Sequence, residues 1–487
     1  MKESIKLALL LCLLISSASF TAAADEASDS VIIHDPAEYI SGTLPVMYIT
    51  TDSLKPVVTK DYYITGKYYL DANGIEGYES IGSPENPLPL SIKGRGNASW
   101  RLEKKPYKIK LDKKAALMGM PKSKQFALMA HYEDWRGYLI DESGFELSRR
   151  IGMSFTPKQE PIELVLNDDY VGIYFLTQNI KVDKERVNIV EQDDNDTIPE
   201  NVTGGWLLEK DNYQDSPQIV LPNDFKLWFT VHSPEVLSDV QYNYISDFLS
   251  KADSLICSPD KSQALWKKYI DIDTLARYYI VSEIVENVEA FSGSCYMHKD
   301  RGENTKIIFG PMWDFGSSFA HPSGNFSCWI FEDEPAYVHN VWIKELVQFP
   351  EFQYKIRKIW TKEYDKLVDG LETYLHDWAY RLRPAGYSDH LRWESSGGHD
   401  IPYQSQKHIT RIKNRIAELD GLWNLKNLYD VNRDGTVDVA DINDLLTKIL
   451  RYTGDQNCDV NMDGEVDVAD VNDIINFMLE HTEIVPN

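Results

Sequence analysis

Positive charge is scarce in this chain of 487 residues: 50 Lys and Arg stand against 76 Asp and Glu, a formal net charge of −26. Nucleic-acid binding depends on concentrated Lys and Arg, so this balance argues against a nucleic-acid partner. Long apolar runs are also missing, since no stretch after residue 24 approaches roughly 18 uninterrupted apolar residues, and we expect no transmembrane segment. At 43% hydrophobic residues the chain is still globular, and its acidity favours solubility, cation binding or both.

Cysteine is rare as well, with five in the chain. Cys12 lies in the first 24 residues, and Cys257, Cys295, Cys328 and Cys458 are too widely spread to form a dense disulfide framework. No Cys-x-x-Cys or Cys/His spacing indicates zinc. A disulfide between Cys295 and Cys328 and a free buried thiol both remain open.

The first 24 residues have the order of a secretory signal. Lys2 and Lys6 precede an apolar run at residues 7–15, and small residues follow over 16–24, with a suitable cleavage site before Asp25. The apolar run is too short to span a membrane. We therefore predict a secreted, soluble protein, extracellular or part of a cell-surface assembly.

The pattern of apolar and polar residues changes along the rest of the chain. Residues 25–43 are polar and predict a flexible lead-in. Short alternating strands follow over 44–215 and longer helical periodicities over 216–425. This pattern predicts an α+β fold with a strand-rich N-lobe, a helix-rich C-lobe and a cleft between them.

Local residue patterns predict several strands and helices. Residues 106–111 alternate, with Tyr107, Ile109 and Leu111 on one face and Lys108 and Lys110 on the other. Residues 162–166 and 170–176 predict a hairpin, and residues 134–150 a helix that Asp134 caps and Gly152 ends. Further helices are expected at 236–252, 272–288, 354–368 and 408–422, and a strand pair at 294–299 and 306–309.

The C-terminal segment contains a duplication, because residues 430–441 and 459–470 repeat one pattern of alternate Asp and Asn with Gly at the sixth position. Calcium needs six or more oxygens around such a tight turn. The ligands expected in the first copy are Asp430, Asn432, Asp434, the Thr436 carbonyl, Asp438 and Asp441. Those in the second are Asp459, Asn461, Asp463, the Glu465 carbonyl, Asp467 and Asp470. Amphipathic helices follow at 439–450 and 468–479, so the pattern predicts two Ca²⁺ sites in a small all-α module with EF-hand-like loops.

This module, residues 429–487, resembles a type I dockerin. The resemblance implies calcium-dependent docking onto a cohesin-bearing scaffold. Dockerins often carry Ser-Thr at loop positions ten and eleven, whereas this chain has Val439-Ala440 and Val468-Ala469. The partner is therefore a cohesin-type protein or another scaffold.

Two short segments before the C-terminal module suggest phosphate binding. A Gly-rich turn at residues 93–100 precedes the strand that bears Lys108, and glycine amides with a lysine can hold phosphates. Glu142 or Glu146 on the next helix could orient that lysine, although surface ion pairs are the commoner explanation. Asp314 follows the strand at 306–309 and is either a divalent-metal ligand or a turn residue.

Together these strings resemble the CotH kinase family over most of residues 44–380. The matching segments are 95–100 with 104–109, 117–121, 166–167 with 170–174, and 286–291 with 310–315. The resemblance implies a bilobal kinase-like fold that binds Mg²⁺ and ATP. It places Asp314 at the metal-binding aspartate and makes Lys105 or Lys108 the lysine that contacts phosphate, with Arg95 and Glu142 also near the cofactor.

One position departs from the family. Where the family commonly has Asp two residues after Asn287, this chain has Glu289. The extra methylene moves the carboxylate by about 1 Å, and a misplacement of that size can lower a rate ~10²-fold. Glu289 is thus a catalytic base, a second metal ligand or neither.

Three functions follow. The first is phosphate transfer from ATP to a protein hydroxyl by Glu289 and Asp314, in a protein that the dockerin anchors to an extracellular assembly. The second is a catalytically silent adhesion or structural module. The third is a carbohydrate-active enzyme in polysaccharide degradation, for which no carboxylate pair is identifiable; the tryptophans at 206, 228, 313 and 329 fit a core equally well.

Overall fold

The computed structural model describes residues 33–132, 136–213, 215–221, 227–319, 341–394, 400–451 and 458–481. The chain separates into residues 1–33 and 34–487, and nearly all described residues belong to the second unit. The expected signal sequence, Asp134, Cys328 and Trp329 lie outside the described residues. Within these ranges no helix is both long and apolar enough to cross a bilayer.

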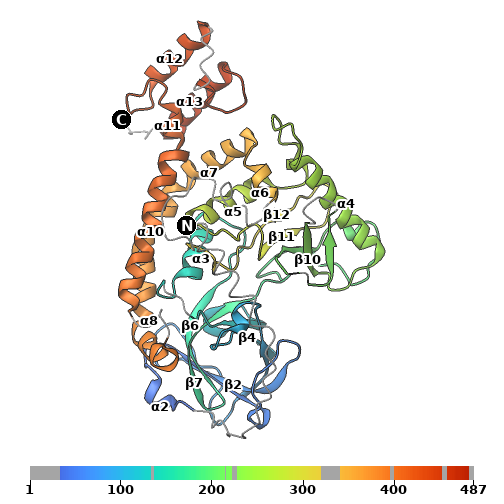
Figure 1. Ribbon diagram of the computed structural model, residues 1–487, viewed down its shortest axis with the longest axis vertical. Helices are drawn as coiled ribbons and strands as arrows, with labels where there is room; N and C mark the ends of the chain where they lie inside the picture. Colours follow the sequence, from blue (N-terminus) through green and yellow to red (C-terminus); the bar gives the residue numbers. More distant parts are fainter. Residues whose placement is uncertain are drawn as a thin grey trace, which may run out of the picture. The chain divides into compact units, whose positions relative to one another are not determined.

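The first half folds into a closed barrel of seven strands (Figure 1). The strands are β1 (Val46–Thr51), β2 (Ile64–Asp71), β3 (Leu88–Gly94), β4 (Tyr107–Ala115), β5 (Ser123–Met129), β6 (Gln159–Leu166) and β7 (Asp169–Gln178). Their order is β1-β2-β3-β4-β5-β7-β6, and the parallel pairing of β1 with β6 closes the barrel. Tyr107, Ile109 and Leu111 point into the apolar interior, which confirms the alternation expected for this strand.

The predicted hairpin is also confirmed. β6 and β7 pair antiparallel around Asn167 and Asp168, whose φ angles of 54° and 64° are both left-handed. Two such residues form the turn whose twist suits a two-residue hairpin.

The segment before the barrel is better ordered than expected. Helix α2 (Pro36–Tyr39) lies there, the His34 amide donates to Asp169 Oδ1 at 2.7 Å, and the Ser41 amide donates to the buried Glu163 carboxylate at 3.0 Å. Residues 34–43 therefore pack on β6 and β7, and the prediction of a flexible lead-in is wrong for them.

A second, five-stranded sheet has the order β12-β11-β8-β10-β9. Its strands are β8 (Trp206–Lys210), β9 (Gln218–Val220), β10 (Trp228–Ser233), β11 (Cys295–Lys299) and β12 (Ile308–Phe309), all antiparallel. The predicted pair at 294–299 and 306–309 is present as β11 and β12. The sheet also crosses the lobe boundary expected at residue 215, so the second half is α+β rather than mainly helical.

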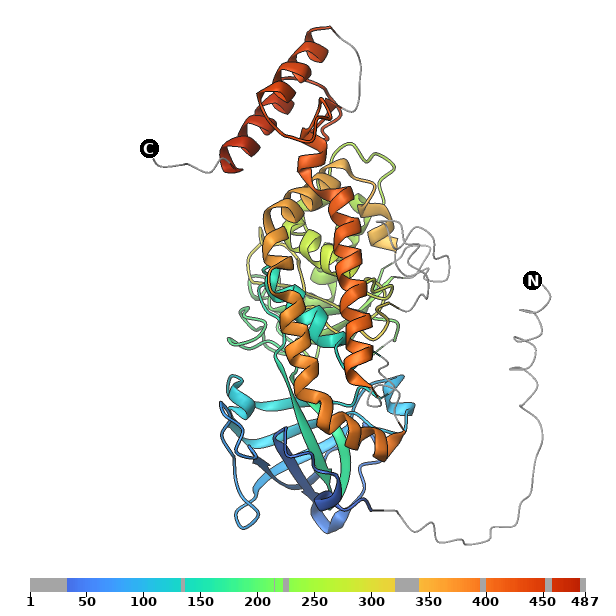
Figure 2. The same ribbon diagram turned by 90° about the vertical axis from the view of Figure 1, so that its left-hand side faces the viewer.

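Helices form most of the rest of the described chain. They are α3 (Ile140–Arg150), α4 (Asp239–Ile256), α5 (Ile272–Ile284), α6 (Val341–Leu346), α7 (Pro350–Val368), α8 (Leu371–Trp393) and α10 (Ile401–Trp423), and α11 (Leu425–Tyr429), α12 (Val439–Leu450) and α13 (Val468–His481) follow. All predicted helices are present, but α3 begins at Ile140, after the expected start at Asp134. Gly152, with φ 87°, follows its end as predicted. The long helices α8 and α10 pack side by side (Figure 2).

A buried ion pair joins the barrel to α8. Lys104 Nζ lies 2.6 Å from Asp389 Oδ1, and both side chains are buried. Asp389 also accepts hydrogen bonds from Tyr138 Oη at 2.6 Å and from the Ile173 amide at 2.8 Å. The carboxylate can approach this amide because Gly172, at φ 95°, has no Cβ, which would otherwise collide with Asp389 Oδ1.

Gly172→Ala is expected to destabilise the protein by about 3 kcal/mol more than Gly77→Ala. Both glycines have left-handed backbones, with φ 95° and 89°, but a Cβ at Gly77 meets nothing within 4 Å. The difference reflects the displaced Asp389 carboxylate, since breaking a buried ion pair costs about 3–5 kcal/mol. Chemical denaturation of both variants measures it, and equal losses would contradict the role of Gly172.

Candidate functional site

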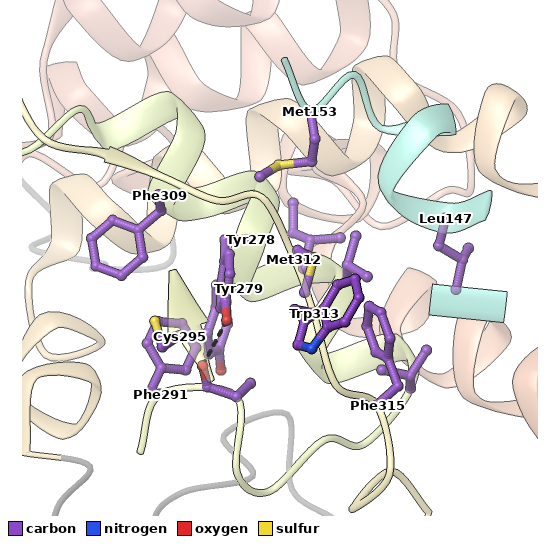
Figure 3. Packing of buried hydrophobic residues seen from close by; sticks show 14 of the residues in the cluster. Leu147, Met153, Tyr278, Tyr279, Phe291, Cys295, Phe309, Met312, Trp313 and Phe315 are labelled. Carbon is purple, nitrogen blue, oxygen red and sulfur yellow. Dashed lines mark hydrogen bonds between the residues drawn. The ribbon is translucent and has the colours of Figure 1, made fainter. Parts of the chain in front are cut away.

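The segment around Asp314 is held by the aromatic residues on either side of it. Trp313 and Phe315 are buried side by side in the apolar cluster (Figure 3). Both pack against Phe145 of α3, with ring centroids 6.0 and 5.6 Å away. Phe315 lies so close to Gly144 that a Cβ there would collide with its ring. Asp314 itself is exposed and has a left-handed φ of 59°. Burial of its two neighbours thus turns its carboxylate toward solvent.

A second loop meets this segment. Asn287 Nδ2 donates to the Asp314 carbonyl at 3.3 Å, and Asn287 forms a β-bridge with Ser318. The Ser317 hydroxyl donates to Glu289 Oε2, and the Glu289 amide donates to Asn287 Oδ1 at 3.2 Å. The two strings that carry the predicted catalytic residues, Glu289 and Asp314, are therefore brought together by direct hydrogen bonds.

Asp141 is a third acidic residue here, and the sequence patterns did not single it out. It is buried in the first turn of α3, where Oδ1 accepts from the Phe315 amide at 3.2 Å and Oδ2 lies 3.3 Å from His131 Nε2. The available signal was its position beside Glu142 at a helix start, where acidic residues are common for other reasons.

These carboxylates interact with one another through space. Although Asp314 is exposed at the surface, the protein groups around it partly desolvate its carboxylate, and this effect, followed by repulsion from Asp141 and Glu289, raises its pKa to about 6. The Gly316 amide and Arg95 oppose this shift. Arg95 lies over the Trp313 ring at 5.5 Å, and burial lowers the pKa of its guanidinium while Tyr296, Asp314 and Asp141 raise it. The site is thus a negative cluster with Arg95 close to it, and Arg136 donates to the carbonyls of Gly316 at 3.2 Å and Ser318 at 2.7 Å in the same loop.

Such a cluster suits a divalent cation, because Mg²⁺ prefers carboxylate oxygens. Across the described ranges, however, no three His, Cys, Asp or Glu side chains converge as a metal-binding group. Asp314 and Asp141 have the right chemistry for Mg²⁺ without forming a complete ligand shell.

The two candidate phosphate lysines lie in different surroundings. Lys108 is on the outer face of β4, where burial lowers its pKa and Lys93 and Arg95 lower it further, so it lies near Arg95. Lys105 Nζ donates to the Trp100 carbonyl at 2.9 Å and sits over the Trp100 ring. Of the two, Lys108 is the one in electrostatic reach of Arg95.

One expectation about phosphate binding is wrong. Glu142 and Glu146 do not orient a lysine of β4, because both pair with Arg149. Glu142 is further held by Tyr374 Oη at 2.6 Å and Gln159 Nε2 at 3.1 Å.

The Gly-rich turn does not offer its first amides to a ligand either. Gly94 and Arg95 donate their N–H groups to the carbonyls of Thr59 at 2.9 Å and Pro106 at 3.1 Å. Lys60 Nζ closes the turn by donating to the Gly96 carbonyl at 2.8 Å. Two amides of the turn are therefore engaged within the protein, and phosphate binding by the rest of the turn stays a prediction.

The structure also has a cavity of about 700 Å³, and its lining does not include Asp314, Glu289 or Asp141. It lies between the β4–β5 end of the barrel, the connection at residues 181–194 and the end of β10. His232 lines it and bonds Glu209 at 2.6 Å, and Glu209 is one of the acidic groups that raise the pKa of Arg95. Its walls carry both lysines and carboxylates, among them Lys122 and Glu235.

The duplicated C-terminal loops fold alike. Gly435 and Gly464 have φ angles of 91° and 94°, and each donates its amide to the first aspartate of its loop, Asp430 or Asp459. The twelfth-position carboxylates are fully buried and also bind loop amides. Asp441 accepts from Asn432 and Asp438, and Asp470 from Val460, Asn461 and Asp467.

The other proposed ligands of these loops are half-buried or exposed. They are Asn432, Asp434, Thr436 and Asp438 in the first loop and Asn461, Asp463, Glu465 and Asp467 in the second.

A seven-stranded barrel, a mixed α+β second lobe and an acidic site on converging loops make up a mixed α+β protein. Residues 92–418 match the CotH kinase protein family, and the chain belongs to that family. None of the curated proteins compared with the chain matches it.

Asp314→Asn is expected to stabilise the metal-free protein at pH 7.5. An acid whose pKa is raised from 3.8 in the unfolded chain to about 6 in the folded one lowers stability as pH rises between these values. The variant should therefore melt at a higher temperature above pH 6 and like the wild type below about pH 4. Because water reaches this carboxylate, the gain is smaller than the full shift implies.

Thermal melts from pH 4 to 8 measure this difference. Asp377→Asn, at an exposed position of α8, is the control. A pH-independent difference would contradict the raised pKa of Asp314.

Proposed function

We propose that the body binds Mg²⁺ and ATP beside Asp314 and transfers the terminal phosphoryl group to a hydroxyl of a protein. The observation that carries this proposal is the convergence of Asp314, Glu289 and Asp141 near Arg95. Phosphoryl transfer needs little besides positioning and charge stabilisation, which acidic metal ligands and nearby cations can supply.

Each residue has a distinct role in this proposal. Asp314 and Asp141 hold Mg²⁺, which would offset the charge of the phosphates. Arg95 and Lys108 approach the phosphates from the barrel side. Glu289 takes the proton of the acceptor hydroxyl or serves as a second metal ligand, with Oε2 kept in place by Ser317.

A catalytically silent binding module is the second candidate. The observation that favours it is the engagement of Glu142 with Arg149, Tyr374 and Gln159, which leaves no glutamate of α3 to orient a β4 lysine. Glu289 in place of aspartate points the same way. A carbohydrate-active enzyme has less support, because Trp206, Trp228 and Trp313 are buried and cannot form a sugar-stacking surface.

We also propose that the protein is secreted and that its tail is a calcium-dependent dockerin that anchors it to a cohesin-type or other scaffold protein. The support is the matching geometry of the two loops and the oxygen-rich donor set of each. Asp430 and Asp459 begin these sets, and Asp441 and Asp470 end them.

Phosphate transfer is tested with labelled ATP, Mg²⁺ and candidate surface proteins. Wild-type protein should label an acceptor, and Asp314→Ala should lower labelling at least ~10²-fold, because it removes the proposed metal ligand. Asp377→Ala, on the exposed face of α8, is the matched control. Labelling that is equal in all three proteins, or absent from all, would remove the enzyme proposal.

Calcium dependence of the tail is tested by chelation. EGTA should lower the helical circular dichroism and the hydrogen-exchange protection of residues 430–481, because metal binding and folding of such loops are coupled. Asp430→Ala combined with Asp459→Ala should lose the response to added calcium. A tail whose protection ignores both chelator and substitutions would contradict the calcium proposal.

A further inference from the structure

Several residues around Asp314 hold an unfavourable backbone conformation. Glu286, Ser294, Asp314 and Phe319 are not glycine, yet their φ angles are 49°, 50°, 59° and 53°. Left-handed conformations of this kind persist where the surroundings over-determine them, and they concentrate at functional sites. These loops therefore need contacts from other parts of the protein that keep them in place.

One side chain contacts two of these strained residues at once. Arg411 of α10 donates through Nη1 to the Phe319 carbonyl at 3.1 Å and through Nη2 to Glu286 Oε2. Its guanidinium also lies over the Phe319 ring, 4.7 Å from the centroid. The Phe319 amide in turn donates to the Glu286 carbonyl at 3.3 Å. Arg411 therefore closes a small network across two loops that are far apart in sequence.

Each loop leads directly to a candidate catalytic residue. Glu286 precedes Asn287, which binds the Asp314 carbonyl and the Glu289 amide. Phe319 follows Ser317 and Ser318, which bind Glu289 and form the bridge to Asn287. A shift of either strained residue would thus move Glu289 and Asp314 relative to each other.

The chemistry of arginine matters for this arrangement. A guanidinium presents several donors in a planar fork and can bind a carboxylate and a carbonyl together, whereas a lysine ammonium is a point charge on a flexible stem. Glu286 is buried, and burial raises its pKa while Arg411 lowers it. Arg411 therefore both neutralises Glu286 and fixes the backbone of the neighbouring loop.

We infer that Arg411 is a positioning residue that holds the Glu289 and Asp314 loops in their working geometry, a role that rests on the proposed phosphate transfer. It acts through its contacts with Glu286 and Phe319.

The test compares three variants in the full chain. Arg411→Lys keeps the charge but loses the fork. Arg411→Met combined with Glu286→Gln removes the contact without leaving a buried carboxylate unpaired. Lys413→Gln, two positions along α10, removes only an exposed ion pair with Glu372 and is the control.

Two readouts separate positioning from general stability and from the proposed function. Amide hydrogen exchange of residues 286–289 and 314–319 should be about tenfold faster in both Arg411 variants and unchanged in the control. In the phosphate-transfer assay with ATP and Mg²⁺, kcat should fall on the order of tenfold while KM for ATP changes less than about twofold.

Unchanged exchange in the two loops, or equal acceleration throughout the body, would overturn the inference. Faster exchange confined to the loops together with a lowered kcat supports it. If the wild type transfers no phosphate, the proposed function fails, and the exchange readout alone then decides whether Arg411 holds the loops.

Discussion

The arrangement of this body depends on one charge pair removed from water. Lys104 enters the barrel wall just before β4, and Asp389 comes from α8, 285 residues later. Neither ion is tolerable there alone, since an unpaired buried charge costs several kcal/mol. The pair therefore fixes α8 against the barrel.

That constraint extends to the acidic site through packing. α8 packs along α10, and α10 carries Arg411, which reaches the loops of Glu286 and Phe319. A contact in the barrel wall and the geometry of the acidic site are thus linked by two long helices. Stability and site geometry therefore depend on some of the same helices.

At the acidic site, burial acts on Trp313 and Phe315, and charge repulsion acts on Asp314 between them. Burial of Trp313 and Phe315 fixes the backbone, and Asp141 binds the Phe315 amide, so this carboxylate also supports the turn. The same carboxylate repels Asp314 and raises its pKa. The protein thus tolerates an unfavourable cluster of negative charge where a cation would relieve it, a pattern typical of metal and catalytic sites.

Sequence patterns predicted the strands, turns and helices that depend on residues close together in the chain. The alternation of β4, the β6–β7 hairpin, and the helices α12 and α13 follow from periodicity and turn residues, and the structure has them. The strings that hold Glu289 and Asp314 were also recognisable. Long-range partners were not: Glu142 pairs with Arg149 instead of a lysine, and Asp141 gains its role from Phe315, 174 residues away. Closure of the barrel through β1 and β6 is equally non-local.

Glu289 shows why such long-range partners matter. It stands where the family commonly has aspartate, and its contacts in the structure affect where its carboxylate lies. Considered alone, the extra methylene displaces a carboxylate by about 1 Å and weakens the case for catalysis. In the structure its Oε2 accepts a hydrogen bond from Ser317, on the same loop as Asp314. The longer side chain thus has a fixed partner beyond the position where an aspartate would end. The position of the Glu289 carboxylate therefore depends on its hydrogen bond with Ser317 as well as on the length of its side chain.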